Sequence, residues 1–270
     1  MASTRTTDTA HNVAALDEAQ VSGNWVQIIF PWLLVVIAWG IVLLAFVTNR
    51  ASLIDHDYLL RTSRLPWLVA FIVFLISWQI MTVAMMLPSA LSMVSSIGAL
   101  SRGRGPLWLV QGSFILGYTF VWTLFACVAF LGDTLVHQLV NHWRWLYLHS
   151  WFIGTITLLV AGCFQLSPLK RSCLQHCCHE AAPRTTLPGP ARTGTIWRIG
   201  VRYGLFCLGA CWAIMLVMFG IGMKSLFWIV ALTGVMLVEK EIPGGQRLRV
   251  AIGAGFLFLA VFWLLIPLMA

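Results

Sequence analysis

Residues 107–131 read LWLVQGSFILGYTFVWTLFACVAFL, a run of sequence without a single charged side chain. A helix that crosses the hydrocarbon core of a bilayer needs about 20 consecutive, mostly apolar residues. The apolar residues in this run are continuous, whereas the strands of a membrane barrel alternate between apolar and polar residues. The run therefore predicts a transmembrane α-helix, in which the backbone hydrogen bonds are made within the segment.

Similar apolar runs lie on both sides of this one. The runs that predict spans are residues 26–47, 66–88, 107–131, 146–166, 201–222, 225–239 and 250–269. We therefore predict an all-α protein, a polytopic transmembrane helical bundle with about seven spans. Residues 1–24 are predicted to form a polar N-terminal tail, and residues 25–270 a single transmembrane helical domain.

The composition of the chain agrees with a membrane location. Of its 270 residues, 60% are hydrophobic and only 10% are charged, whereas soluble domains carry roughly 25% charged residues. The formal net charge is +8, but the basic residues lie in short loops between the apolar runs, which is typical of topology determinants. We therefore predict the lipid bilayer as a partner and no binding to nucleic acid.

The distribution of basic residues predicts an orientation, because Lys and Arg concentrate in cytoplasmic loops. Seven spans place the two termini on opposite sides of the membrane. Of the 17 Lys and Arg residues, five would lie on the side of the C-terminus, namely Arg50, Arg61, Arg64, Arg144 and Lys224, and the other twelve on the side of the N-terminus. We predict a cytoplasmic N-terminus and a cytoplasmic loop at about 167–200, whose second half is an irregular linker rich in Pro and Gly.

That predicted loop opens with the sequence CLQHCCH at residues 173–179. On a helix, Cys173 and Cys177 lie one turn apart on one face, and His176 is adjacent to Cys173. Thiolates and imidazoles bind Cu(I) or Zn, so Cys173, His176, Cys177 and Cys178 are candidate metal ligands. The alternative interpretation is an interfacial loop that is rich in Cys and carries palmitoyl groups.

The fifth predicted span carries sulfur side chains at regular spacing. Cys207, Cys211, Met215 and Met218 fall within a narrow stripe of the helix, at about 100° per residue. Such a stripe offers soft thiol and thioether ligands to Cu(I), which makes Cys207, Cys211 and Met215 candidate ligands. We predict that these three residues face the interior of the bundle together, within reach of Met81 and Met85. Ordinary core packing explains the same stripe, because Cys is a small hydrophobe and Met fills gaps in cores.

The second predicted span ends with a group of methionines. Met81 and Met85 share a helix face, and Pro88 is expected to kink the helix there because it lacks a backbone donor. Both methionines are candidate Cu(I) ligands, with core packing as the alternative.

On the outer side, Asp133 and His137 are spaced to meet on one helix face, although we favour a solvated amphipathic segment with an interfacial aromatic belt there.

Four segments of the chain carry a resemblance to a known family. They are residues 78–88 with AMMLP at 84–88, residues 162–174 (GCFQLSPLKRSCL), residues 207–215 (CLGACWAIM) and the pair Glu239-Lys240. Together they resemble a family of bacterial predicted metal-binding integral membrane proteins of unknown function. The chain departs from the family pattern at Ala210, where a Cys is usual, and at Phe164, where a Tyr is common. The resemblance implies a bacterial inner-membrane location and a link to a metal ion, and the soft ligands of the chain favour copper.

The leading hypothesis is a membrane protein that binds or translocates a soft metal ion, Cu(I), for copper homeostasis or for delivery to a copper enzyme. The alternative is a non-catalytic structural or accessory subunit of a larger membrane complex, with other membrane subunits as partners. A third interpretation is a thiol or redox enzyme that uses the cysteines at 173–178. The sequence shows no Ser-His-Asp arrangement and no nucleotide motif, which favours a protein that is not an enzyme.

Overall fold

The computed structural model describes residues 29–48, 66–100, 106–149, 151–180, 193–221, 225–242 and 245–269. Over these residues the chain is helical and forms no β-strand, which confirms the all-α class. The predicted tail at residues 1–24 and residues 181–192 of the predicted loop lie outside the described residues.

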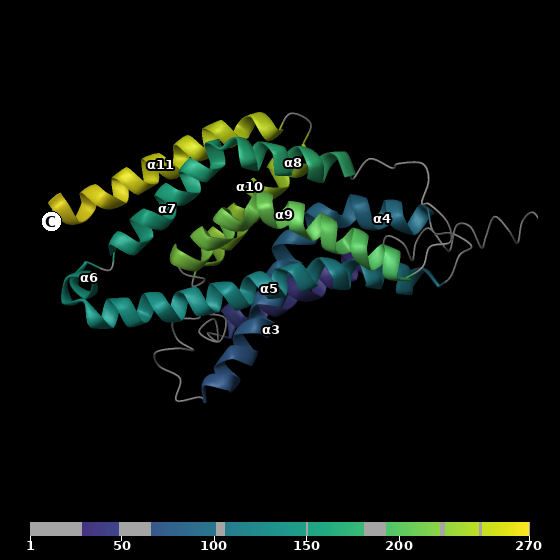
Figure 1. The fold of residues 1–270 in the computed structure, drawn as a ribbon, viewed down its shortest axis with the longest axis horizontal. Helices are drawn as coiled ribbons and strands as arrows, with labels where there is room; N and C mark the ends of the chain where they lie inside the picture. The colour runs from purple at the N-terminus through teal and green to yellow at the C-terminus, as the bar shows by residue number, and fades with distance from the viewer. Residues whose placement is uncertain are drawn as a thin grey trace, which may run out of the picture.

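The helices follow one another through the chain as shown in Figure 1. In order they are the helix Ile29–Val47, α3 (Trp67–Met86), η2 (Pro88–Ala90), α4 (Leu91–Leu100), α5 (Leu107–His142), α6 (Arg144–Leu148), α7 (Trp151–Leu166), α8 (Pro168–Glu180), α9 (Thr193–Ile221), α10 (Leu226–Glu241) and α11 (Gly245–Met269).

Five of the described helices are long and apolar enough to cross a membrane. They are Ile29–Val47, α3, α5, α9 and the part of α11 from Arg247 to Leu265. A sixth candidate is broken, because α7 and α8 meet at an angle of 65°. The exact count of about seven is therefore not confirmed, since α10 has only 16 residues and a crossing needs about 20.

Part of the chain that we predicted as a loop is helical. Residues 168–180 form α8, which begins with Pro168 in the first turn, where the missing N–H of proline costs no hydrogen bond. α9 begins at Thr193, well before the predicted span at residue 201. α8 is too polar to be recognised as a span, but it buries Leu174 and Cys177 and packs against α9.

Helix α9 lies at the centre of the bundle, in contact with α5, α7, α8 and α10 (Figure 1). Its approach to α5 depends on glycine. A Cβ atom on Gly200 would overlap the carbonyl oxygen of Phe114, and a Cβ atom on Gly117 would lie 2.5 Å from the carbonyl oxygen of Trp197. Small residues let two transmembrane helices pack backbone against backbone, so these two positions fix the distance between α5 and α9.

The predicted kink at Pro88 is a complete break of the helix. α3 ends at Met86, and the chain continues through the short turn η2 into α4. Pro88 cannot donate a backbone hydrogen bond, and the turn that replaces the helix buries Ser89, which is only 2% exposed. The break thereby brings the hydroxyl group and the backbone carbonyl of Ser89 into the interior of the bundle, within hydrogen-bonding distance of side chains from α9 and α10.

Candidate functional site

The sulfur stripe of α9 faces the interior of the bundle. Cys207, Cys211, Met215 and Met218 are each at most 1% exposed, which confirms the predicted direction of the stripe. Leu205, on the same helix, is 56% exposed and lies on the side that can face lipid. Burial of the stripe is compatible with core packing as well as with metal binding, so the chemistry of its neighbours matters.

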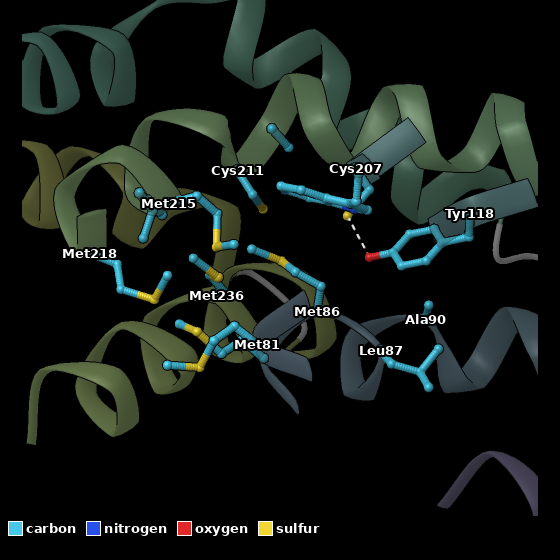
Figure 2. Packing of buried hydrophobic residues seen from close by; sticks show 14 of the residues in the cluster. Met81, Met86, Leu87, Ala90, Tyr118, Cys207, Cys211, Met215, Met218 and Met236 are labelled. Carbon is cyan, nitrogen blue, oxygen red and sulfur yellow. Dashed lines mark hydrogen bonds between the residues drawn. The ribbon is translucent and has the colours of Figure 1, made fainter. Parts of the chain in front are cut away.

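Sulfur atoms from two other helices join the stripe. Met81, Met85 and Met86 of α3 and Met236 of α10 are fully buried in the same core as the α9 residues. Figure 2 shows the sulfur ends of Met86, Met215 and Met236 directed toward one another beside Cys211. We call the set Met86, Cys207, Cys211, Met215 and Met236 the sulfur core.

Sequence reasoning found only part of this set. Cys207, Cys211 and Met215 are among the predicted ligands, whereas Met86 and Met236 are not. A single methionine in an apolar helix has no periodicity that distinguishes it from packing material. Met81 and Met85 are buried as core residues, and Figure 2 shows Met81 below Met86 in the view.

Cys207 lies at the centre of a chain of polar contacts. Its sulfur lies 3.1 Å from the hydroxyl of Tyr118 (Figure 2) and accepts a hydrogen bond of 2.9 Å from the ammonium group of Lys240. The same ammonium group donates to the Ser89 hydroxyl at 3.1 Å, which in turn donates to the carbonyl oxygen of Met86 at 2.8 Å. The thiol of Cys211 lies next to that of Cys207.

The Cys-His sequence of α8 does not converge on one site. Cys177 is 2% exposed and lies against the hydroxyl of Tyr203, which donates to the carbonyl oxygen of Ser89 at 3.1 Å. Cys173 is partly buried, and His176 is exposed and stacks on the ring of Phe206. The side chain of Cys178 lies outside the described part of the structure.

The cysteines of α8 are divided because α8 is an amphipathic helix. Cys177 lies on the buried face that packs against α9, while His176 lies at the exposed edge of the same contact, where it stacks on Phe206 of α9. Of the three candidate ligands on α8 whose side chains the structure describes, Cys177 is the one linked to the contacts around Cys207, through the hydroxyl of Tyr203 and the carbonyl oxygen of Ser89.

A buried ionic triad lies where α7, α8 and α10 meet. The ammonium group of Lys170 lies 2.7 Å from a carboxylate oxygen of Glu239, and the two side chains are 0% and 1% exposed. The Gln165 amide completes the triad, because its oxygen accepts from Lys170 at 2.5 Å and its nitrogen donates to Glu239. Arg202 of α9 lies over the ring of Phe206.

The residues predicted on the outer side are separate from the sulfur core. Asp133 and His137 meet at 3.4 Å in the last part of α5, as their spacing predicted. Trp143, Trp145 and Tyr147 are exposed in the segment that follows, which fits the interfacial aromatic belt.

The sulfur core fits copper better than zinc. Among the residues that the structure describes, no group of three or more His, Cys, Asp or Glu side chains is placed to hold a metal ion. Structural zinc sites use four such ligands in a tetrahedron. The sulfur core instead offers two thiols and the thioethers around them, and thiolate and thioether ligands select Cu(I).

Comparison with known protein families also indicates copper. The model of the family described as PpoB2, copper chaperone, matches residues 75–263. The chain belongs to the PpoB2 family of copper chaperones. The PpoB2 match includes the sulfur core, Lys240 and the ionic triad, and it confirms the expected link to a metal-related family, with copper as the metal. No curated protein and no solved structure gives a significant match.

Proposed function

We propose that this protein is a membrane copper chaperone that binds Cu(I) in the sulfur core and passes it on, across the membrane or to a copper enzyme. The observation that carries the proposal is the position of Cys207 and Cys211, which lie side by side and fully buried within a group of thioethers. Membership of the PpoB2 family supports copper as the cargo.

The location of the sulfur core suits a monovalent soft ion. A bare charge in the hydrocarbon core is costly, whereas an ion bound to sulfur exchanges its water ligands for thiolates and thioethers. The methionines bind more weakly than thiolates and lie on three different helices, so they can accept the ion from Cys207 and Cys211. Met81, Met85 and Met218 extend the sulfur surface beyond the core.

Cysteine replacement tests this proposal. Replacing Cys207 and Cys211 together with Ser should weaken Cu(I) binding by more than the roughly 10–100-fold that loss of an outer partner costs. The measurement is competition against a Cu(I) chelator on protein purified in detergent under reducing conditions. The matched control replaces Cys127 and Cys163, which lie away from the fully buried core, and unchanged Cu(I) affinity in the Cys207/Cys211 variant would exclude the site.

We further propose that the protein lies in the bacterial inner membrane with its N-terminus in the cytoplasm and about seven crossings. In support, α10 returns the chain between α9 and α11, which run in the same direction (Figure 1). Its 16 residues extend about 24 Å at 1.5 Å per residue, so the crossing requires a locally thinned bilayer.

Reporter fusions test the orientation and the role of α10 together. A fusion after Arg192 should report the cytoplasm, and a fusion after Ala270 should report the outer side, because α9, α10 and α11 would each cross once. If α10 does not cross, both fusions give the same signal, and the proposed seven-span topology is wrong.

A further inference from the structure

We propose that Lys240 is a fixed counter-cation of the sulfur core, and that its charge makes the site selective for monovalent over divalent metal ions. This inference rests on the proposed function and concerns the metal selectivity of the same site. The ammonium group of Lys240 lies 2.9 Å from the sulfur of Cys207.

The ammonium group of Lys240 is held in place by hydrogen bonds to two helical segments. It donates to Cys207 of α9 and to the hydroxyl of Ser89, which the break at Pro88 turns inward. The Ser89 hydroxyl is itself fixed by its bond to the Met86 carbonyl. Electrostatic interactions also link Lys240 to Cys211, Cys177 and Tyr118, so the positive charge lies on the side of the core where the cysteines are.

The other charges near the core do not replace this one. Lys170 is held by Glu239 at 2.7 Å, so the two form a pair without net charge. Glu241, next to Lys240 in the chain, is exposed, so water screens its charge. Arg249 is bound to the carbonyl oxygen of Ser167. The thioethers of the sulfur core carry no charge at all.

The charge balance then distinguishes one ion from another. Binding requires thiolates, so the two cysteines release their protons and contribute two negative charges. Cu(I) between them forms an anion with a single negative charge, which the positive charge of Lys240 cancels. A divalent ion such as Zn(II) already neutralises the two thiolates, so Lys240 would leave a net positive charge in the bundle.

Net charge matters here because the site is buried among apolar helices. An unpaired ion costs several kcal/mol in such surroundings, and a fixed charge close to the site acts through a low dielectric. Lys240 therefore favours the monovalent complex and disfavours the divalent one, and the soft ligands add to the same preference.

Removal of the charge tests the inference. We expect Lys240→Met to weaken binding of Cu(I) and Ag(I) by roughly 10–100-fold while Zn(II) binding stays equal or becomes tighter. Lys240→Arg keeps the charge and should keep the preference. Lys240→Gln keeps a hydrogen-bond donor without the charge and should behave like Lys240→Met, and it decides the matter if the Met variant does not fold. Arg202→Gln, which removes an exposed cation from α9, is the control for total charge.

The measurement is the ratio of Ag(I) to Zn(II) affinity, obtained by chelator competition on the purified full-length chain. A purely structural role of Lys240 would weaken both ions together and leave the ratio unchanged. An unchanged ratio in the Met and Gln variants, with Cu(I) bound by the wild-type protein, overturns the role of Lys240 alone. Wild-type protein that binds no Cu(I) overturns the proposed function together with it.

Discussion

Replacing Glu239 with Gln is expected to lower the free energy of unfolding by about 3–5 kcal/mol, the usual cost of breaking a buried ion pair on one side. The variant keeps the size of the side chain but leaves the ammonium group of Lys170 without its carboxylate, in a position that is 0% exposed. Thermal unfolding in detergent measures the effect.

The matched control for this prediction is Glu241→Gln, two residues further along the chain. Glu241 is exposed, and loss of a charge there should change stability by less than about 1 kcal/mol. Equal stability of the two variants would contradict the triad. Replacing Lys170 and Glu239 together with Met should recover much of the loss, because two apolar side chains leave no unpaired charge.

The second large effect is expected from adding one methyl group to Gly200. A Cβ atom there would overlap the carbonyl oxygen of Phe114, and a backbone atom cannot rotate aside as a flexible side chain can. Gly200→Ala should therefore push α5 and α9 apart and destabilise the bundle by about 1–3 kcal/mol, as overpacking does in other cores. Thermal unfolding in detergent again measures the change.

Gly194→Ala is the control, because it adds the same group to the same helix. Nothing lies within 4 Å of a Cβ atom at Gly194, and alanine favours a helix over glycine by up to about 1 kcal/mol. The two substitutions should thus have opposite signs, and stabilisation by Gly200→Ala would disprove the close approach. Because Tyr118 and Cys207 meet across α5 and α9 at 3.1 Å, Gly200→Ala should also disturb the sulfur core.

The sequence was most informative where a pattern repeats. The uncharged run at residues 107–131 predicted a spanning helix, and the structure has the longer helix α5 there. The stripe from Cys207 to Met218 predicted which face of α9 is buried, because four sulfur residues at helical spacing define a direction even when their role is open.

The features that the sequence did not reveal depend on single residues or on tertiary contacts. Lys170 was counted as a basic residue of a loop, because α8 is too polar to be recognised as part of a span. Lys240 lies between two glutamates at the end of an apolar run, which gives no sign of a buried position. The helix break at Pro88 and the approach of α9 place its ammonium group next to Cys207. Contacts between residues 33 or more positions apart leave no local pattern in the chain.

The ionic triad also affects the order in which the chain is made and inserted. Lys170 precedes Glu239 by 69 residues, which corresponds to roughly 3–14 s of translation at about 5–20 residues per second. During that interval the ammonium group has no carboxylate partner from α10, and a lone charge is costly inside a bilayer. In the membrane topology that we propose, the polar helix α8 is therefore most stable at the membrane surface until α10 is synthesised, and the bend between α7 and α8 allows it to remain there. In that topology, the pairing of Lys170 with Glu239 makes the packing of α8 against α10 depend on the insertion of α10, so the buried pair links two helices that are synthesised at different times.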